Sequence, residues 1–179
     1  MMNRIYRKVW LIATMLFLVS ARINAQTHSD WLNGVQDNNQ GLFAVTQNDS
    51  GNVLGEYCFW ESETCIWLIV VDIKCDKDHT YPALGNTDSG AAPLTLVCDT
   101  KLKSGGTRMI FTEWERLESL FSKSEHLGIA YPLENDKFKV YRFSLKGLSD
   151  ATAQIDKDFS YGVSQKNKRK KSSTQTQTL

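Results

Sequence analysis

The chain of 179 residues carries 21 basic and 20 acidic side chains, but the two kinds are unevenly distributed. Four basic residues lie within residues 1–25 and five within residues 166–171, which leaves 12 basic against 20 acidic side chains in residues 26–165. Because phosphate binding depends on clustered lysine and arginine, this acidic body argues against nucleic acid as a partner.

The N-terminus has the three-part layout of a secretory signal peptide. Basic residues at positions 4–8 precede an apolar run at 9–21, and Ile23 and Ala25 suit the third and first positions before a cleavage site. The run is shorter than the ~20 residues that span a bilayer, which favours cleavage over the alternative of an uncleaved anchor. We therefore predict a signal over residues 1–25, a periplasmic or secreted protein, and no transmembrane span after cleavage.

The mature part has the length of one domain, and we expect a single core over residues 26–163. It opens with strands predicted at 41–47 and 53–60, joined by a turn of asparagine, aspartate, serine and glycine at 48–51. The next predicted strand, 65–75, is rich in β-branched residues and apolar on both faces over its first half. This pattern is typical of a central strand that is covered on both sides.

The four cysteines form an even set, which in an exported chain favours two disulfides over free thiols. A strand from Cys65 to Cys75 separates these residues by ~33 Å, whereas a disulfide needs Cα atoms within ~7 Å, so two pairings remain. We prefer a Cys58–Cys65 disulfide, because a hairpin tip at 61–64 places these residues opposite each other. The second disulfide is then Cys75–Cys98, and strand alternation points both residues into the core. A zinc site is the weaker alternative, because the chain has no C-x-x-C pair.

After this strand we expect a loop at 76–92 and then a hairpin with strands at 93–102 and 107–111. A helix is predicted to begin at Thr112, whose spacing to a glutamate three residues later is that of a capping box. The helix has one apolar stripe and is predicted to end near Gly128.

The last predicted elements are a strand at 137–145 and a short helix capped by Ser149. A slip in the apolar alternation of that strand indicates a bulge or an edge position. From residue 164 to 179 the chain is polar and basic, and we predict a disordered tail. The tail holds five basic residues that can contact anionic surfaces: Lys166, Lys168, Arg169, Lys170 and Lys171.

The order of strands, helix, strand and short helix predicts the fold class α+β. We expect an antiparallel β-sheet of hairpins or a meander, either barrel-like or sandwich-like and stapled by the disulfides. One clear amphipathic helix and a short C-terminal helix are expected to cover it. No repeat or long low-complexity stretch divides the body into smaller units.

No catalytic, cofactor-binding or metal-binding motif stands out in the sequence. Asp76, Asp78 and His79 fit a solvated loop better than a metal site, because the other ligands of a calcium loop are missing. Asp88-Ser89, with His79 as a base, lacks the strand–turn–helix context of a nucleophilic serine. The remaining candidates have plainer explanations: His126 serves the last carbonyls of the predicted helix, and Glu113, Glu115 and Glu118 complement its dipole.

The best candidate for a binding surface is the pair Phe59 and Trp60 at the predicted hairpin tip. The alternative is that one or both rings pack over the Cys58–Cys65 edge. With no catalytic constellation and a cross-linked scaffold, we favour an exported binding or interaction protein over an enzyme, with an envelope or extracellular protein or ligand as partner. The alternative function is a small secreted hydrolase whose site is assembled from non-adjacent residues.

Overall fold

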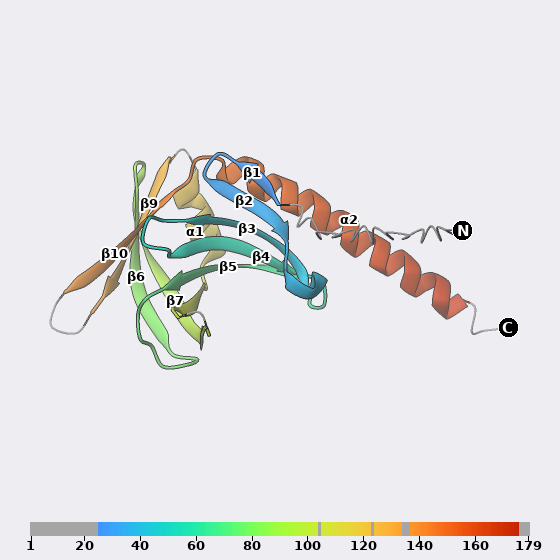
Figure 1. Cartoon of the computed structure of the whole chain (residues 1–179), viewed down its shortest axis with the longest axis horizontal. Helices are drawn as coiled ribbons and strands as arrows, with labels where there is room; N and C mark the ends of the chain where they lie inside the picture. Colours follow the sequence, from blue (N-terminus) through green and yellow to red (C-terminus); the bar gives the residue numbers. More distant parts are fainter. Residues whose placement is uncertain (1–24, 104, 123, 134–136, 176–179) are drawn as a thin grey trace, which may run out of the picture.

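The computed structural model describes residues 25–103, 105–122, 124–133 and 137–175, so the predicted signal lies, except for its last residue, outside the described residues. In this part of the chain ten strands form one antiparallel sheet of the order β1-β2-β3-β4-β5-β8-β7-β6-β9-β10, which confirms the predicted α+β class (Figure 1). The elements are β1 (Gln26–His28), β2 (Trp31–Val35), a 3-10 turn (Asp37–Asn39), β3 (Gly41–Gln47), β4 (Val53–Phe59), β5 (Thr64–Val71), β6 (Thr80–Thr87), β7 (Gly90–Lys101), β8 (Thr107–Phe111), α1 (Trp114–Phe121), β9 (His126–Pro132), β10 (Phe138–Ser144) and α2 (Leu148–Gln175).

The sheet is a meander from β1 to β5 and then changes its order. The chain leaves β5 through residues 72–79 and enters β6, which pairs with β7 and β9. The next strands return along the sheet until β8 pairs with β5. The predicted central strand is therefore confirmed as central, between β4 and β8, although it ends at Val71 rather than at residue 75.

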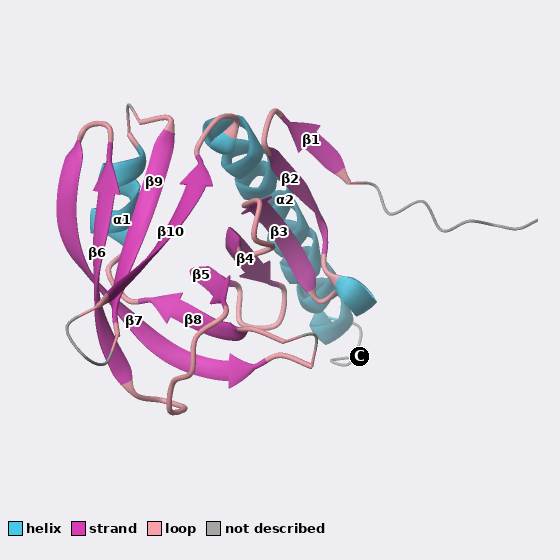
Figure 2. Cartoon of the chain, turned by 60° about the vertical axis from the view of Figure 1, so that its left-hand side comes forward, coloured by secondary structure: helices cyan, strands magenta, loops and turns pink. Residues whose placement is uncertain are grey.

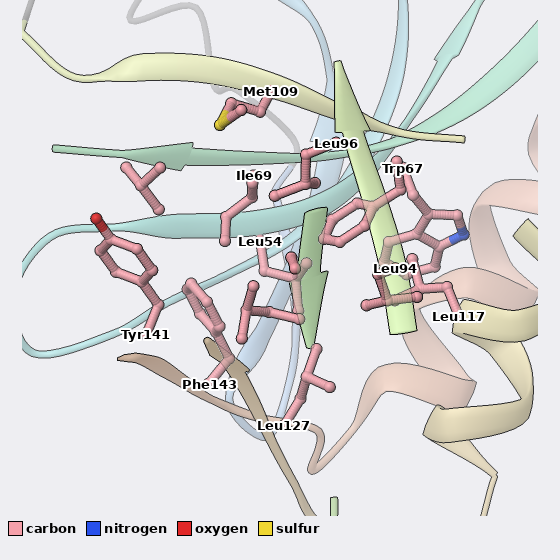
Figure 3. Packing of buried hydrophobic residues seen from close by; sticks show 14 of the residues in the cluster. Leu54, Trp67, Ile69, Leu94, Leu96, Met109, Leu117, Leu127, Tyr141 and Phe143 are labelled. Carbon is pink, nitrogen blue, oxygen red and sulfur yellow. The ribbon is translucent and has the colours of Figure 1, made fainter. Parts of the chain in front are cut away.

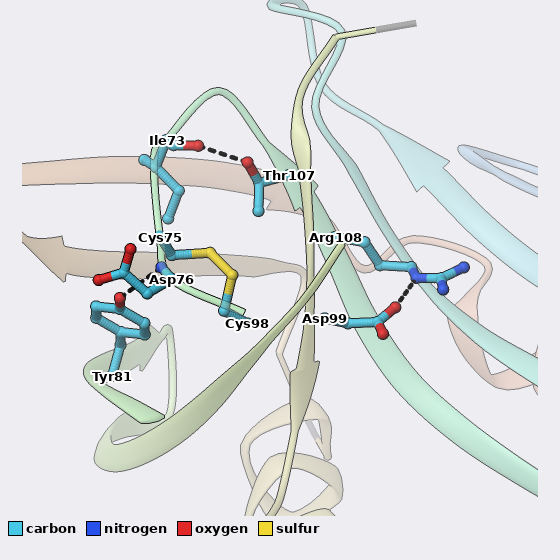
Figure 4. Close-up of a disulfide and its surroundings, with 8 residues drawn as sticks. All are labelled: Ile73, Cys75, Asp76, Tyr81, Cys98, Asp99, Thr107 and Arg108. Carbon is cyan, nitrogen blue, oxygen red and sulfur yellow. Dashed lines mark hydrogen bonds and ion pairs between the residues drawn. A yellow bond between two sulfur atoms is a disulfide. The ribbon is translucent and has the colours of Figure 1, made fainter. Parts of the chain in front are cut away.

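The two disulfides join the cysteine pairs that the strand pattern predicts. Cys58 and Cys65 lie opposite each other in the register of the β4–β5 hairpin. Cys75 and Cys98 tie the segment after β5 to β7 (Figure 4). One disulfide thus fixes a hairpin, and the other fixes a connection that crosses between two parts of the sheet.

Hydrogen bonds assist the second disulfide in holding the crossover at 72–79. The Thr107 hydroxyl donates to the carbonyl oxygen of Ile73 at 2.6 Å, and the backbone N–H of Asp76 donates to Tyr81 Oη at 2.8 Å (Figure 4). Backbone groups in a segment that lacks strand partners need other partners, and these bonds provide them.

The sheet coils so that its two ends approach each other (Figure 2). β10 contacts β3, although the two strands do not pair. At the neighbouring corner the indole N–H of Trp31 donates to the Ser144 carbonyl oxygen at 3.0 Å, and the Ser144 hydroxyl donates to the Asp30 carboxylate at 2.6 Å. The sheet is therefore barrel-like, which is one of the two predicted forms.

The core lies inside this coil and draws on both parts of the sheet (Figure 3). Leu54 and Ile69 come from the first five strands, whereas Leu96, Leu127 and Phe143 come from the strands that follow the crossover. α1 packs on β6 and β7, and α2 lies along β1 to β4. Each helix thus covers a different part of the sheet.

α1 differs from its prediction at both ends. Its N-cap is Glu113 rather than Thr112, and no side-chain bond caps the helix. The Glu113 carboxylate instead accepts bonds from the backbone N–H and the hydroxyl of Thr95 in β7, at 2.8 and 2.7 Å. The helix ends at Phe121, and Gly128 lies in β9, where pairing with β6 and β10 satisfies the backbone on both sides.

Strands β1, β2, β6 and β9 are absent from the sequence prediction, and the predicted loop at 76–92 is wrong over β6. β6 and β9 contain Pro82, Gly85, Gly128 and Pro132, residue types that locally indicate turns or edge positions. β10 is at the end of the sheet order, as the edge alternative predicts. Its register with β9 is continuous, so the predicted bulge is absent.

α2 is longer than the predicted short helix and reaches Gln175, so the prediction of a disordered tail is wrong for residues 164–175. Lysine, arginine and glutamine are good helix formers, and adding them to an existing helix avoids a new nucleation step. Gly147, with φ of +88°, precedes α2, where a Cβ atom would clash with the His28 carbonyl. No helix in the described part of the chain is long and apolar enough to cross a membrane.

Candidate binding pocket between the two helices

A pocket of about 760 Å³ opens between α1, α2 and the inner face of the β4–β5 hairpin. Four aromatic rings and five carboxyl groups contribute to its wall, and none of the described residues that line it is a lysine, arginine or histidine. The rings belong to Trp67, Trp114, Phe121 and Phe159, and the carboxyls to Glu56, Glu63, Glu118, Glu125 and Asp156.

The floor of the pocket is formed by three inward-facing residues of the hairpin, Glu56, Cys65 and Trp67. Glu56 on β4 lies opposite Trp67 on β5, and the next pair on this face is Cys58 and Cys65. A carboxylate oxygen of Glu56 and the two sulfur atoms all lie within 4.8 Å of one another. Because the sulfurs form a disulfide, this cluster lacks the thiolate ligands that bind metal ions.

Glu56 is buried without a partner. Its side chain belongs to a residue only 6% exposed, and among the described residues its carboxyl has no hydrogen bond or ion pair. Burial raises the pKa of Glu56 to about 8, and the nearby carboxylates of Asp156 and Glu118 act in the same direction. At neutral pH most Glu56 side chains are therefore protonated and able to donate a hydrogen bond.

The indole N–H of Trp67 is a second polar group without a partner in the described part of the chain. The ring is held edge-on to Trp31, with 6.1 Å between the ring centroids, and its centroid lies 4.8 Å from that of Phe121 in α1. The great majority of buried polar groups in proteins are hydrogen-bonded. Two unpaired groups at opposite register positions therefore mark the floor as a candidate site.

Helical periodicity supplies the other two walls. On α1, Trp114, Glu118 and Phe121 are spaced by four and three residues and so share one face. On α2, Asp156 and Phe159 are three residues apart and share a face in the same way. Each helix thus contributes both a carboxyl and an aromatic ring to the pocket.

Only two of the five carboxyls are neutralised by a base. Lys146 Nζ lies 3.3 Å from Glu125 Oε2, and Lys166 Nζ lies 3.2 Å from Glu63 Oε1. The other three, from β4, α1 and α2, have no ion-pair partner among the described residues. Burial also raises the pKa of Asp156. Because Glu56 is mostly protonated at neutral pH, the excess negative charge of the pocket comes from the exposed side chains of Glu118 and Asp156 at its mouth.

The predicted binding surface at the hairpin tip lies beside this pocket. The Trp60 ring stacks on Phe159 of α2, with centroids 5.1 Å apart, and a Cβ atom on Gly162 would approach it to 2.6 Å. Lys166 Nζ donates to the Trp60 carbonyl oxygen at 2.7 Å. Phe59 and Trp60 are both half-buried and line a separate shallow hollow.

The polar candidates from the sequence lie elsewhere. His126 begins β9, and its Nδ1 atom lies 3.4 Å from the Asp88 carboxylate on the exposed surface. The Ser89 hydroxyl is hydrogen-bonded to that of Ser124 at 2.8 Å. The Asp76–His79 segment belongs to the crossover, where the His79 backbone bonds to Asp76 and to β7. The structure thus places Asp88, Ser89 and His126 near one another but outside the pocket.

Sequence reasoning did not identify Glu56 or Trp67 as site residues, although one signal was available. Glu56 is the only charged residue in the predicted strand 53–60 and lies in phase with Leu54 and Cys58 on the apolar face. A charged residue in that position is rare without a partner. The sequence around Asp156 gave no comparable signal, because acidic residues are common on the exposed faces of helices.

Comparisons with known proteins support the fold and go no further. No protein-family model matches the chain, and no curated protein matches it. Among solved structures, the fold is similar to that in the crystal structure of invasion-associated protein B from Bartonella henselae. The two chains are 16% identical, the match covers 73% of this chain and 94% of that one, and the TM-score is 0.53. This chain therefore shares its α+β architecture with that protein.

Proposed function

We propose that this protein is an exported binding protein and that the pocket between α1 and α2 holds an apolar or aromatic part of its ligand. The observation that supports this most directly is Glu56, a buried residue of the pocket lining whose carboxyl has no partner among the described residues, opposite the unpaired indole N–H of Trp67. Buried polar groups without partners are destabilising, so their retention beside an open pocket favours a role in binding. A volume of about 760 Å³ also suits a small ligand.

Export is supported by the two disulfides, because disulfides form and persist mainly in oxidising compartments. The signal over residues 1–25 and the periplasmic or secreted location remain predictions. Intact-mass measurement on protein recovered from the periplasm or medium tests both, with a chain that begins at Gln26 as the expected result. A recovered chain that retains residues 1–25 contradicts the cleavage prediction.

The floor of the pocket is rigid before any ligand binds. β4 pairs with β3 and β5 along its length, and the Cys58–Cys65 disulfide closes the hairpin beneath the pocket. Rigid sites lose less conformational entropy on binding than flexible ones. This arrangement favours recognition of a small group by a preformed surface.

An uncharged fluorescent probe, N-phenylnaphthylamine, tests the proposal on the mature protein. We expect saturable binding with increased probe fluorescence, and a loss of that binding in Thr152→Trp, where a large ring enters the pocket from α2. The matched control is Thr80→Trp at the exposed start of β6. Absence of saturable binding, or equal loss in both variants, contradicts the proposed site.

A second candidate function is hydrolysis, and one observation favours it. Glu56, with its pKa raised to about 8, shares a pocket with Glu118 and Asp156, and pairs of carboxyls with different protonation states perform acid–base catalysis of glycoside hydrolysis. A panel of chromogenic aryl glycosides tests this, with release of the chromophore by the mature protein and its loss in Glu56→Gln as the expected results. No release from any glycoside leaves the binding function as the better account.

A further inference from the structure

We infer that the ligand of this pocket is a small organic cation: an ammonium or guanidinium head on an apolar or aromatic stem. The inference rests on the proposed function of the pocket and adds the chemical class of the ligand. Two independent features support it, namely the sign of the charges around the pocket and the kind of rings in its wall.

The charges of the pocket select a cation over an anion. Five carboxyls line it, and the only described bases paired with them are Lys146 and Lys166 at the rim. An incoming carboxylate or phosphate would face the unpaired acidic groups of Glu118 and Asp156, which repel it. An incoming ammonium group gives the Glu56 carboxyl the partner that it lacks.

The rings of the pocket suit the same ligand. Trp114, which is half-buried, is of the type that binds cations most strongly through the ring face, and Phe121 and Phe159 add apolar surface. Carboxyls together with aromatic rings are therefore able to hold a charged head and an apolar stem at once. A purely apolar ligand would leave Glu56 without a partner.

Binding of a cation favours the ionised form of Glu56. Two further groups oppose that ionisation, Glu118 from α1 and Asp156 from α2, while Glu63 and Glu125 at the rim are paired with lysines. A cation that binds beside Glu56 displaces its proton, so affinity rises as the pH increases towards the pKa of this residue. The linkage gives the inference a signature that simple apolar binding lacks.

Three matched probes test the inference: phenylbutylamine, phenylbutanol and phenylbutyrate, titrated calorimetrically against the mature protein. The amine stays charged up to about pH 9, since alkylamines have a pKa of about 10.4. We expect the amine to bind about tenfold more tightly than the alcohol and the carboxylate to bind most weakly. The amine's affinity should also rise between about pH 6 and about pH 8, the range over which Glu56 ionises.

Substitutions test whether the preference for the amine depends on Glu56. Glu56→Gln should lose about tenfold in affinity for the amine, keep its affinity for the alcohol and lose most of the pH dependence. Glu115→Gln, an exposed position on α1, is the control and should behave as the natural chain. Asp156→Asn should give a smaller loss for the amine alone, and provides a second test where Glu56→Gln fails to fold.

The outcomes separate this inference from the proposed function. Equal affinity for amine and alcohol overturns the inference and leaves the pocket as an apolar site, provided that N-phenylnaphthylamine still binds. Tighter binding of phenylbutyrate than of the amine also overturns it. If none of the three probes nor N-phenylnaphthylamine binds, the proposed function itself is wrong.

Discussion

The pocket between α1 and α2 contrasts with a groove on the other face of the sheet. That groove lies between the β3–β4 turn and the outer surfaces of β6, β9 and β10, and its volume is about 1060 Å³. Two of its acidic groups have hydrogen-bond donors: Asp88 accepts from the backbone N–H groups of Glu125 and His126 at 2.9 and 3.1 Å, and Asp30 accepts from Ser144. In the pocket, by contrast, Glu56 has no such partner among the described residues.

The size of a hollow therefore does not identify a site. The groove is larger, but its Asp88 and Asp30 carboxylates have backbone or hydroxyl donors, and Arg142 and His126 contribute basic groups to its wall. In the pocket the Glu56 carboxyl has no hydrogen-bond or ion-pair partner from the described part of the chain. A ligand therefore gains more from the pocket, because it does not have to displace existing hydrogen bonds.

The largest expected effect concerns the pH dependence of stability. The folded-state pKa of Glu56 is about 8 against an ordinary pKa of 4.5, so between these values the folded chain retains a proton that the unfolded chain has released. The free energy of unfolding should therefore fall by about 4 kcal/mol in total as the pH rises from about 5 to about 8, because of Glu56. Urea unfolding across this range measures it, and Glu56→Gln should remove the slope.

The groove provides the control for this prediction. Its acid Asp88 has a lowered pKa, mainly because the Glu125 backbone N–H donates to it, so its contribution is present at neutral pH and is lost in acid. Asp88→Asn should therefore reduce the loss of stability in acid and leave the slope of stability against pH unaltered above pH 5. If Glu56→Gln and the natural chain show the same slope above pH 5, the burial argument for Glu56 is wrong.

Removing each disulfide should separate stability from pocket integrity. Replacing Cys75 and Cys98 by serine should lower the free energy of unfolding by about 3.4 kcal/mol, and replacing Cys58 and Cys65 by serine should lower it by about 2.5 kcal/mol. The first loss is larger because the Cys75–Cys98 disulfide closes the longer loop. Of the two replacements, only that of Cys58 and Cys65 alters the pocket floor. Probe binding at low denaturant should therefore weaken in the Cys58/Cys65 variant alone, and the opposite order contradicts the assignment of the floor.

Trp60→Ala tests how the hairpin tip is used. The half-buried ring stacks on Phe159, so we expect a loss of about 2 kcal/mol in the free energy of unfolding, smaller than for a fully buried tryptophan. Tyr161→Ala removes an aromatic ring that is 67% exposed on the same helix and should leave stability almost unchanged. An unchanged melting temperature in Trp60→Ala would instead support the predicted free recognition surface at Phe59 and Trp60.

The smallest expected effect is that of substitutions in the groove on ligand binding in the pocket. Asp88→Asn and His126→Gln alter an exposed ion pair that is not part of the pocket. Neither variant should change the affinity for phenylbutylamine or for N-phenylnaphthylamine beyond the error of the titration. A clear loss of affinity in either variant would move the site from the pocket to the groove.

The local sequence was sufficient for features that depend on neighbours along the chain. The turn at 48–51 and the hairpin that brings Cys58 opposite Cys65 follow from residue types and from alternation. Short-range patterns were insufficient for β6 and β9. Their prolines and glycines are acceptable only because strands distant in sequence pair with them.

The candidate site shows the same division. The alternation of β4 by itself determined that Glu56 faces inward with Leu54 and Cys58, and the heptad-like spacing of Trp114 and Phe121 determined one helical face. That these residues share one pocket with Asp156 and Phe159 was decided by the tertiary structure, because α2 packs across β1 to β4 although residues 60–147 separate it from β4 in the sequence. The length of α2 was also a tertiary outcome, since packing of its first half stabilises a helix that the polar sequence of its second half would not nucleate.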